Sequence, residues 1–327
     1  IALTGLKIKA GSPLGTRFTM ELANGSEGYI PPPEQHSLGG YTTWNARTAG
    51  LEVDAEPRIT ETVLGLLEQV AGGRRRAIEE AETPASKALL AASPAAYYRL
   101  GDAVGPRIRD HAAHARHAHL EPRVALALTG AGPELFPGRD WTNRAVHFAG
   151  GRVVAPAPNP ARFTIELLIW NGMPNDARPV TGYLASIGGD GDAPARGEHL
   201  GIGGTHRPGA AGKLLVFNGD EAQGVLVGKT ALPLRTWHHV AWVRDGGRVR
   251  VHLDGEPTPE IEGELPSGVG NPLEARLFLG GRCDNFANLA GKLDEVAVFD
   301  RALTPEEIRS HARAGRGATE PRERRAD

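Results

Sequence analysis

Residues 291–308 read Gly291-Lys-Leu-Asp-Glu-Val-Ala-Val-Phe-Asp-Arg-Ala-Leu-Thr-Pro-Glu-Glu-Ile308, and this run predicts a strand that passes into a short helix. Its first half is rich in strand-forming apolar residues. Thr304 is a favourable residue to precede a helix, a proline suits the first helical position, and Glu307 completes a Thr-x-x-Glu capping box. The ordered part of the chain is therefore expected to end with a strand and a capped helix.

The composition allows a sizeable core and excludes some classes of protein. The chain has 327 residues, of which 40% are hydrophobic and 23% charged, and it has room for two domains. A formal net charge of −2 gives no electrostatic reason to expect a nucleic-acid partner. No apolar run approaches the roughly 20 residues of a transmembrane helix. The 43 glycines and 25 prolines favour many turns over long helices.

The region 87–316 is expected to be all-β after a short initial helix. Arg162-Phe-Thr-Ile-Glu-Leu-Leu-Ile-Trp170 is a strongly strand-forming run. Thr236-Trp-His-His-Val-Ala-Trp-Val-Arg-Asp-Gly246 leads into a second run at 248–253, and Asp245-Gly246-Gly247 between them predicts a hairpin turn. Many short strands with glycine-rich turns indicate a β-sandwich or jelly roll.

The rest of the chain divides into three parts. Residues 1–72 are expected to form a small α+β unit, with strand-like runs at 1–8 and 18–22 and an amphipathic helix at 59–70 that ends at a pair of glycines. Residues 73–86 have the composition of a linker, and the charged tail 317–327 is expected to be disordered. The chain begins inside a strand-like run without an initiator methionine, which we interpret as the C-terminal part of a longer bacterial protein whose export signal could lie upstream.

Several stretches of the β region together resemble a LamG-like jelly roll, a domain of the concanavalin A-like lectin/glucanase type, at 87–316. The resemblance implies two antiparallel sheets packed face to face, a carbohydrate or protein ligand and, in some such domains, a structural Ca²⁺. The stretches that carry it are 93–102, 143–150, 162–170, 236–246, 251–255 and 291–308.

Two aspartates are candidate calcium ligands, because Ca²⁺ prefers carboxylate and carbonyl oxygens. Asp102 and Asp294 lie near the first and last strands of the β region, which are expected to pair. The alternative is that Asp102 caps a turn and that Asp294 is an ordinary polar strand residue.

The loop 282–288 is a candidate ligand-binding loop. Asp284, Asn285 and Asn288 surround an aromatic residue, and amide and carboxylate groups suit sugar hydroxyls. The same composition is also common in loops without a ligand.

Histidines 111, 114, 117 and 119 allow a zinc hypothesis by their spacing, but no cysteine is nearby and alanine and arginine lie between them. The single cysteine, Cys283, excludes an internal disulfide.

The first unit carries a second resemblance. Leu22-Ala-Asn-Gly-Ser-Glu-Gly-Tyr-Ile-Pro-Pro-Pro-Glu34, followed by Gly40-Tyr41, is similar to the C-terminal end of neutral/alkaline ceramidase-like zinc amidohydrolases. The resemblance implies that Tyr29 is a zinc ligand and that Tyr41 is catalytic, donating a hydrogen bond to the oxyanion that forms from the substrate amide. Ser26 and the loop 31–33 depart from the family's pattern, which puts the lipid substrate in doubt.

These resemblances imply a glycan- or cell-surface-binding accessory module at the end of a zinc amidohydrolase that is secreted, periplasmic or on the cell surface. The other zinc ligands would precede Ile1, so this chain alone is expected to be inactive. Two alternatives stay open: a structural sandwich without a glycan ligand, and a part of an active amide hydrolase whose catalytic core lies upstream. A glycosidase role for the sandwich itself is disfavoured, because no Glu-x-Asp-x-x-Glu run is present.

Overall fold

The chain forms two compact units, one of residues Ile1–Ala81 and Ala103–Pro106 and one of Glu82–Asp102 and Arg107–Asp327. The computed structural model describes residues 2–36, 39–76, 82–103, 105–132, 143–191, 196–220 and 224–316. Within these ranges, no helix combines the length and the apolar character that crossing a bilayer requires.

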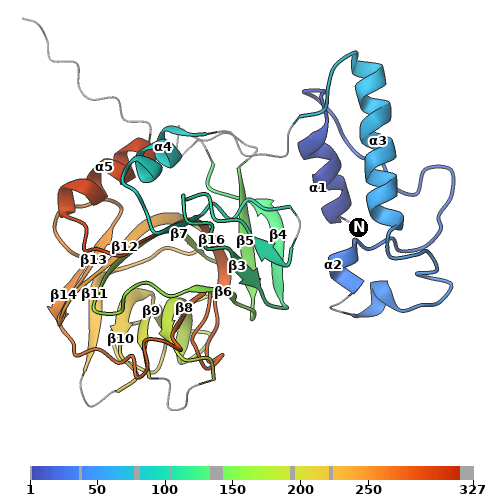
Figure 1. Ribbon diagram of the computed structural model, residues 1–327. Coiled ribbons are helices and arrows are strands. Elements are labelled where there is room, and N and C mark those ends of the chain that lie inside the picture. Colours follow the sequence, from blue (N-terminus) through green and yellow to red (C-terminus); the bar gives the residue numbers. More distant parts are fainter. Residues whose placement is uncertain are drawn as a thin grey trace, which may run out of the picture. The chain divides into compact units, whose positions relative to one another are not determined.

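The described part of the first unit is helical (Figure 1). The predicted amphipathic helix is confirmed as α3, and it ends at Gly72, whose φ of 63° is the left-handed cap that glycine tolerates. The strand predicted at 1–8 is wrong, because this run lies in a helix, and the run 18–22 is irregular and largely exposed. The helical elements are α1 (Ala2–Gly11), α2 (Pro33–His36), the 3₁₀ turn η1 (Tyr41–Thr43) and α3 (Ala55–Ala71).

A buried ion pair joins the two longer helices of this unit. Lys7 on α1 lies 3.3 Å from Glu56 on α3, and both side chains are almost fully buried. The apolar core beside this pair is thin, since Ala49 and Leu64 are the buried hydrophobic residues among the described positions of the unit. Large exposed apolar residues of the unit are Phe18, Met20, Leu22, Tyr29, Tyr41, Trp44, Leu51, Val53, Ile59, Leu66 and Val70.

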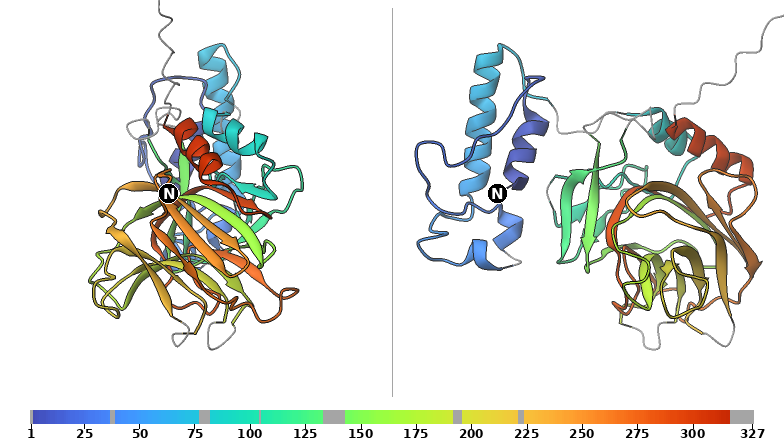
Figure 2. Two further views of the ribbon diagram at one scale, coloured as in Figure 1. Left: turned by 90° about the vertical axis from the view of Figure 1, so that its left-hand side faces the viewer. Right: turned by 180° about the vertical axis from the view of Figure 1, so that it is seen from behind.

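The described part of the second unit contains two antiparallel eight-stranded sheets, which confirms the predicted sandwich (Figure 1, Figure 2). The first sheet has the order β14-β13-β12-β7-β16-β5-β4, with β1 also paired to β16. Its strands are β1 (Ala96–Tyr98), β4 (Val124–Thr129), β5 (Arg144–Ala149), β7 (Arg162–Asn171), β12 (Trp237–Asp245), β13 (Arg248–Leu253), β14 (Ile261–Glu264) and β16 (Ala290–Phe299).

The second sheet has the order β11-β10-β9-β8-β15-β6-β3-β2. Its strands are β2 (Arg107–Ile108), β3 (Ala118–Leu120), β6 (Val153–Pro156), β8 (Val180–Gly188), β9 (Glu198–Gly203), β10 (Lys213–Phe217), β11 (Val225–Ala231) and β15 (Arg276–Leu279).

The pairings and turns predicted from sequence are present. Strand β1 pairs with β16, so the first and last strands meet as expected. Strands β12 and β13 form the hairpin around Gly246, with Asp245 opposite Arg248. The helix α5 (Pro305–Gly315) follows β16 and has the predicted capping box between Thr304 and Glu307.

Two helices, α4 (Pro84–Ala91) and α5, cover the outer face of the first sheet. Figure 1 and Figure 2 show them side by side at one end of the sandwich. Leu89 of α4 and Ile308 of α5 share one apolar cluster with Ala241, Val243 and other residues of the sheet.

Candidate functional site

A pocket of about 360 Å³ lies on the outer face of the second sheet. Leu215 and Phe217 of β10 line it, whereas Leu214 and Val216 are completely buried. Because successive side chains of a strand point to opposite faces, the first pair faces the pocket and the second faces the interior of the sandwich. The volume is at the lower end of the range of small-molecule sites, about 300–1,000 Å³.

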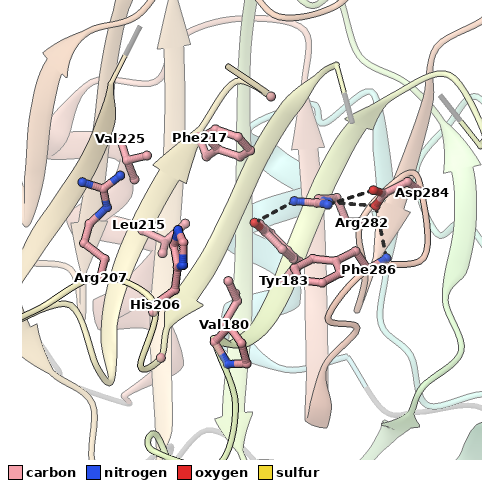
Figure 3. Close-up of a pocket in the computed structure, with 14 residues that line it drawn as sticks. Val180, Tyr183, His206, Arg207, Leu215, Phe217, Val225, Arg282, Asp284 and Phe286 are labelled. Carbon is pink, nitrogen blue, oxygen red and sulfur yellow. Dashed lines mark hydrogen bonds and ion pairs between the residues drawn. The ribbon is translucent and has the colours of Figure 1, made fainter. Parts of the chain in front are cut away.

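The pocket has an apolar floor and two polar walls. The floor is formed by side chains of three strands of the second sheet, with Tyr183 on β8, Phe217 on β10 and Val225 on β11. One wall is the loop after β15, and the other is the loop after β9 (Figure 3). A planar ligand could therefore rest on the floor and meet polar groups at both edges.

Arg282 organises the wall formed by the loop after β15. It makes a two-point ion pair with Asp284, at 2.7 and 2.8 Å, and donates a hydrogen bond of 3.1 Å to the Tyr183 hydroxyl. Its guanidinium lies 5.0 Å from the Tyr183 ring centre and 4.5 Å from that of Phe286. Figure 3 shows Arg282 between Tyr183 and Asp284. Such a network fixes the orientation of every group in it.

The ionisation of this pair follows from the same contacts. Burial alone would raise the pKa of Asp284, but the hydrogen bonds and charge of Arg282 outweigh it, so the net pKa is lowered. Burial alone would lower the pKa of Arg282. The hydrogen bonds and charge of Asp284, with the contact to Tyr183, outweigh burial, so the net pKa of Arg282 is raised. Both groups are therefore charged at neutral pH, and each neutralises the other.

The opposite wall carries His206 and Arg207, from the loop after β9. Both line the cavity on the side away from Arg282 (Figure 3). The His206 side chain is exposed and Arg207 is half-buried. The described part of the pocket thus combines the rings of Tyr183, Phe217 and Phe286 with two guanidinium groups and one carboxylate.

The loop 282–288 takes its shape from two of the predicted ligand residues. Asn288 is buried and donates hydrogen bonds to Gly150 O at 2.9 Å and to Asn285 Oδ1 at 3.1 Å. Its own Oδ1 accepts from Arg282 N, and the loop is attached to β8 because Tyr183 N donates to Ala287 O. Of the three predicted residues, Asp284 lines the pocket, whereas these contacts of Asn285 and Asn288 hold the loop.

The two predicted calcium ligands have different surroundings. Asp102 accepts a hydrogen bond from Arg109 N at 3.3 Å. Asp294 is completely buried and accepts from Asn143 Nδ2 at 2.7 Å and Ala131 N at 3.2 Å. No group of three or more histidine, cysteine or acidic side chains suited to a metal occurs in the described ranges. Calcium binding at these aspartates stays a prediction.

The two tyrosines of the amidohydrolase resemblance contact each other in the first unit. The ring centres of Tyr29 and Tyr41 are 5.5 Å apart, edge to face, and Trp44 continues the stack at 5.7 Å from Tyr41. All three rings are exposed, Tyr29 by 42% and Tyr41 by 56%. Zinc binding at Tyr29 and the catalytic role of Tyr41 stay predictions.

Of the four histidines in the zinc hypothesis, His117 lies in a loop and His119 lies on a strand. His117 Nδ1 accepts from Asp110 N at 3.1 Å, and His119 lies on β3. In the described part of the chain, these histidines do not form a group of three or more side chains that could hold a metal ion.

Sequence reasoning found Asp284 and the aromatic Phe286 beside it, but it missed the rest of the pocket. Tyr183, His206, Arg207 and Phe217 belong to segments far apart in the sequence, and none stands in a recognisable motif. The weak pattern that was available is the continuous apolar run of β10, Leu214 to Phe217, which places apolar residues on both faces of the strand. This indicates that the outer face is covered or functional.

Comparisons with known proteins agree on the sandwich. Residues 161–309 match the family model described as the concanavalin A-like lectin/glucanases superfamily, a laminin G type of model, and this segment contains every residue that lines the pocket. A search of curated proteins found no match.

Solved structures with similar folds are distant in sequence. Domain 4 of AbnA, an extracellular GH43 arabinanase from Geobacillus stearothermophilus solved with arabinotriose, has a TM-score of 0.46 at 16% identity, covering 67% of this chain and 98% of that one. Trypanosoma rangeli sialidase in complex with sialic acid has a TM-score of 0.48 at 14% identity, with 80% of this chain and 39% of that one covered. The botulinum neurotoxin serotype D binding domain has a TM-score of 0.46 at 12% sequence identity, and the match covers 67% of this chain and 51% of that one. These likenesses concern the fold alone. The family match over residues 161–309, with the two antiparallel sheets, describes a concanavalin A-like jelly roll.

Proposed function

We propose that the second unit is a carbohydrate-binding module and that the pocket on the outer face of its second sheet is the sugar site. The observation that carries this proposal is the joining of an aromatic floor to a fixed Arg282–Asp284 pair in one pocket of about 360 Å³. The family match at 161–309 supports the same class of ligand.

The chemistry of a sugar ring suits this arrangement. A pyranose has apolar C–H faces, which pack on aromatic rings, and a rim of hydroxyls, which need donors and acceptors in fixed positions. Phe286 offers an accessible ring, exposed by 46%, beside Tyr183 and Phe217. The carboxylate of Asp284 has lone pairs that Arg282 does not use, and these can accept hydrogen bonds from two sugar hydroxyls. Arg282 can donate a hydrogen bond to a sugar oxygen.

Titration calorimetry of the full chain with a panel of oligosaccharides tests the proposal. We expect Phe286→Ala to weaken binding about fivefold or more, because truncating an aromatic contact in a ligand site commonly costs over about 1 kcal/mol. Leu234→Ala is the matched control, since Leu234 is exposed by 42% and does not line the pocket. Absence of binding to every sugar would favour a structural sandwich without a glycan ligand. Equal binding by both variants would mean that the sugar binds outside this pocket.

Repeating the titration with EDTA and with added Ca²⁺ tests the calcium prediction at Asp102 and Asp294. If Ca²⁺ binds there, chelation lowers the melting temperature or the sugar affinity. An unchanged melting curve and affinity would count against a calcium site.

We further propose that the first unit contributes Tyr29 and Tyr41 to an amidohydrolase site whose other zinc ligands lie outside it. The contact between the two rings supports a shared site, and the exposed apolar residues of this unit, among them Trp44 beside Tyr41, suit packing against further protein. The chain alone should then bind Zn²⁺ weakly in equilibrium dialysis and should not hydrolyse N-acyl amides. Tight stoichiometric zinc that is unaffected by Tyr29→Phe would refute this role. A glycan ligand and an amide substrate of this kind favour a secreted, periplasmic or cell-surface location.

A further inference from the structure

We propose, resting on the carbohydrate-binding function above, that the pocket selects sugars bearing a carboxylate and that the guanidinium of Arg207 receives this group. Among the described residues that line the pocket are two guanidinium groups, Arg207 and Arg282, and one carboxylate, Asp284.

The single carboxylate is already engaged. Asp284 binds Arg282 through both oxygens, at 2.7 and 2.8 Å, so that pair is neutral. Among the residues that the structure describes, no hydrogen bond or ion pair holds the Arg207 guanidinium. Among the described residues that line the pocket, one positive charge is therefore uncompensated, and that charge lies on a half-buried side chain.

The loop that carries Arg207 is held in place by its backbone. Thr205 N donates to Arg178 O and His206 N to Pro179 O, both at 3.1 Å, and Ala210 N donates to Arg207 O. The loop packs so closely that a Cβ at Gly204 would lie 2.1 Å from Arg178 O. Arg207 thus projects from a fixed position, which lowers the entropy lost when it binds a ligand.

The position of the charge gives the ligand an orientation. Arg207 and His206 form the wall opposite Arg282 and Asp284 (Figure 3). A sugar ring on the aromatic floor would turn its hydroxyls toward Asp284 and its anionic edge toward Arg207. A guanidinium is charged at every physiological pH and matches a carboxylate with two parallel hydrogen bonds.

The experiment compares matched neutral and acidic ligands, glucose-containing and glucuronic acid-containing oligosaccharides of equal length, with O-sulfated versions as a third arm. We expect the full chain to prefer a carboxylated ligand about tenfold or more, since a charge-assisted hydrogen bond contributes about 1.5–3 kcal/mol. Arg207→Gln should remove this preference and leave the affinity for the neutral ligand within about twofold. Added salt should reduce the preference in the unaltered chain.

Arg250→Gln is the control, since Arg250 is also half-buried but lies on β13 in the other sheet. Equal affinity for neutral and carboxylated sugars would overturn the acidic preference and leave the carbohydrate function standing. A preference that survives Arg207→Gln would overturn the role of Arg207, and a stronger preference for the sulfated ligand would overturn the choice of carboxylate. Binding of no sugar in any arm would overturn the carbohydrate function itself.

Discussion

Glu166 on β7 accepts a hydrogen bond from His311 on α5, with 2.9 Å between Glu166 Oε1 and His311 Nδ1. The other oxygen of Glu166 lies 3.1 Å from Nε2 of His239 on β12. All three side chains are buried, and a cavity of only about 30 Å³ adjoins them. The last helix is thus attached to the sandwich by a polar contact as well as by the apolar cluster beneath it.

Replacing His311 with alanine should destabilise the second unit by about 2–3 kcal/mol, because it removes a partner from a buried carboxylate. The stacking of His311 on Phe299, with ring centres 6.0 Å apart, would be lost as well. Urea denaturation followed by tryptophan fluorescence measures the change. His114→Ala is the control, since His114 is exposed and should change stability by less than about 0.5 kcal/mol. Equal stability of the two variants would show that the contact with Glu166 contributes little.

The contribution of Glu166 to the free energy of unfolding should decrease as the pH falls. Burial alone would raise the pKa of Glu166, but its two histidine partners outweigh this, and the net pKa lies below the ordinary 4.5. A lowered pKa in the folded state means that the contribution is complete above the unfolded-state pKa and is lost as the pH falls through the folded-state pKa.

The free-energy difference between the unaltered chain and Glu166→Gln should therefore be fully present just above the unfolded-state pKa and shrink as the pH falls through the lowered folded-state pKa of Glu166. Denaturation at a series of pH values and constant ionic strength measures it. A difference that grows on acidification would contradict the direction of the pKa shift.

Two glycines in turns allow the cost of backbone strain to be measured apart from the cost of steric overlap. Gly246 and Gly255 have φ values of 59° and 74°, and both follow an aspartate in a turn next to β13. A Cβ at Gly246 would meet no atom within 4 Å, whereas a Cβ at Gly255 would lie 2.4 Å from Ala312 Cβ on α5. Gly246→Ala should cost about 1 kcal/mol from strain alone, and Gly255→Ala about 2–4 kcal/mol.

Thermal unfolding of the two glycine variants provides the comparison. The double variant Gly255→Ala/Ala312→Gly should recover the part of the loss that arises from overlap, because it removes the clashing methyl group. Equal losses for both single variants would mean that α5 moves away at little cost.

The parts of the fold predictable from sequence were those determined by local preferences. The capping box at Thr304, the turn at Gly246 and the amphipathic pattern of α3 each depend on residues a few positions apart, and each was confirmed. The first run, Ile1 to Ile8, was wrongly expected to be a strand. A short apolar run of this kind does not distinguish a strand from a helix, and here the ion pair of Lys7 with Glu56 on α3 accompanies the helix.

Of the pocket, only the polar loop 282–288 was predictable from the sequence. Asp284 and Phe286 are neighbours in sequence, so their composition could be noticed, but their partner Tyr183 is about a hundred positions away. Arg207 has no local pattern at all. Its significance comes from the neutral pairing of Asp284 with Arg282, which only the folded arrangement reveals.

The two units should differ in their ability to fold alone. Among described residues, the first unit buries two hydrophobic residues, Ala49 and Leu64, and exposes many large ones, whereas the second has an extensive apolar core. Because apolar burial is the main favourable contribution to folding, residues 82–316 should unfold in one sharp transition by calorimetry, and residues 1–81 should show none. The melting temperature of 82–316 should lie within a few degrees of that of the full chain. A cooperative transition in 1–81 would contradict the proposal that this unit needs further protein to complete its core.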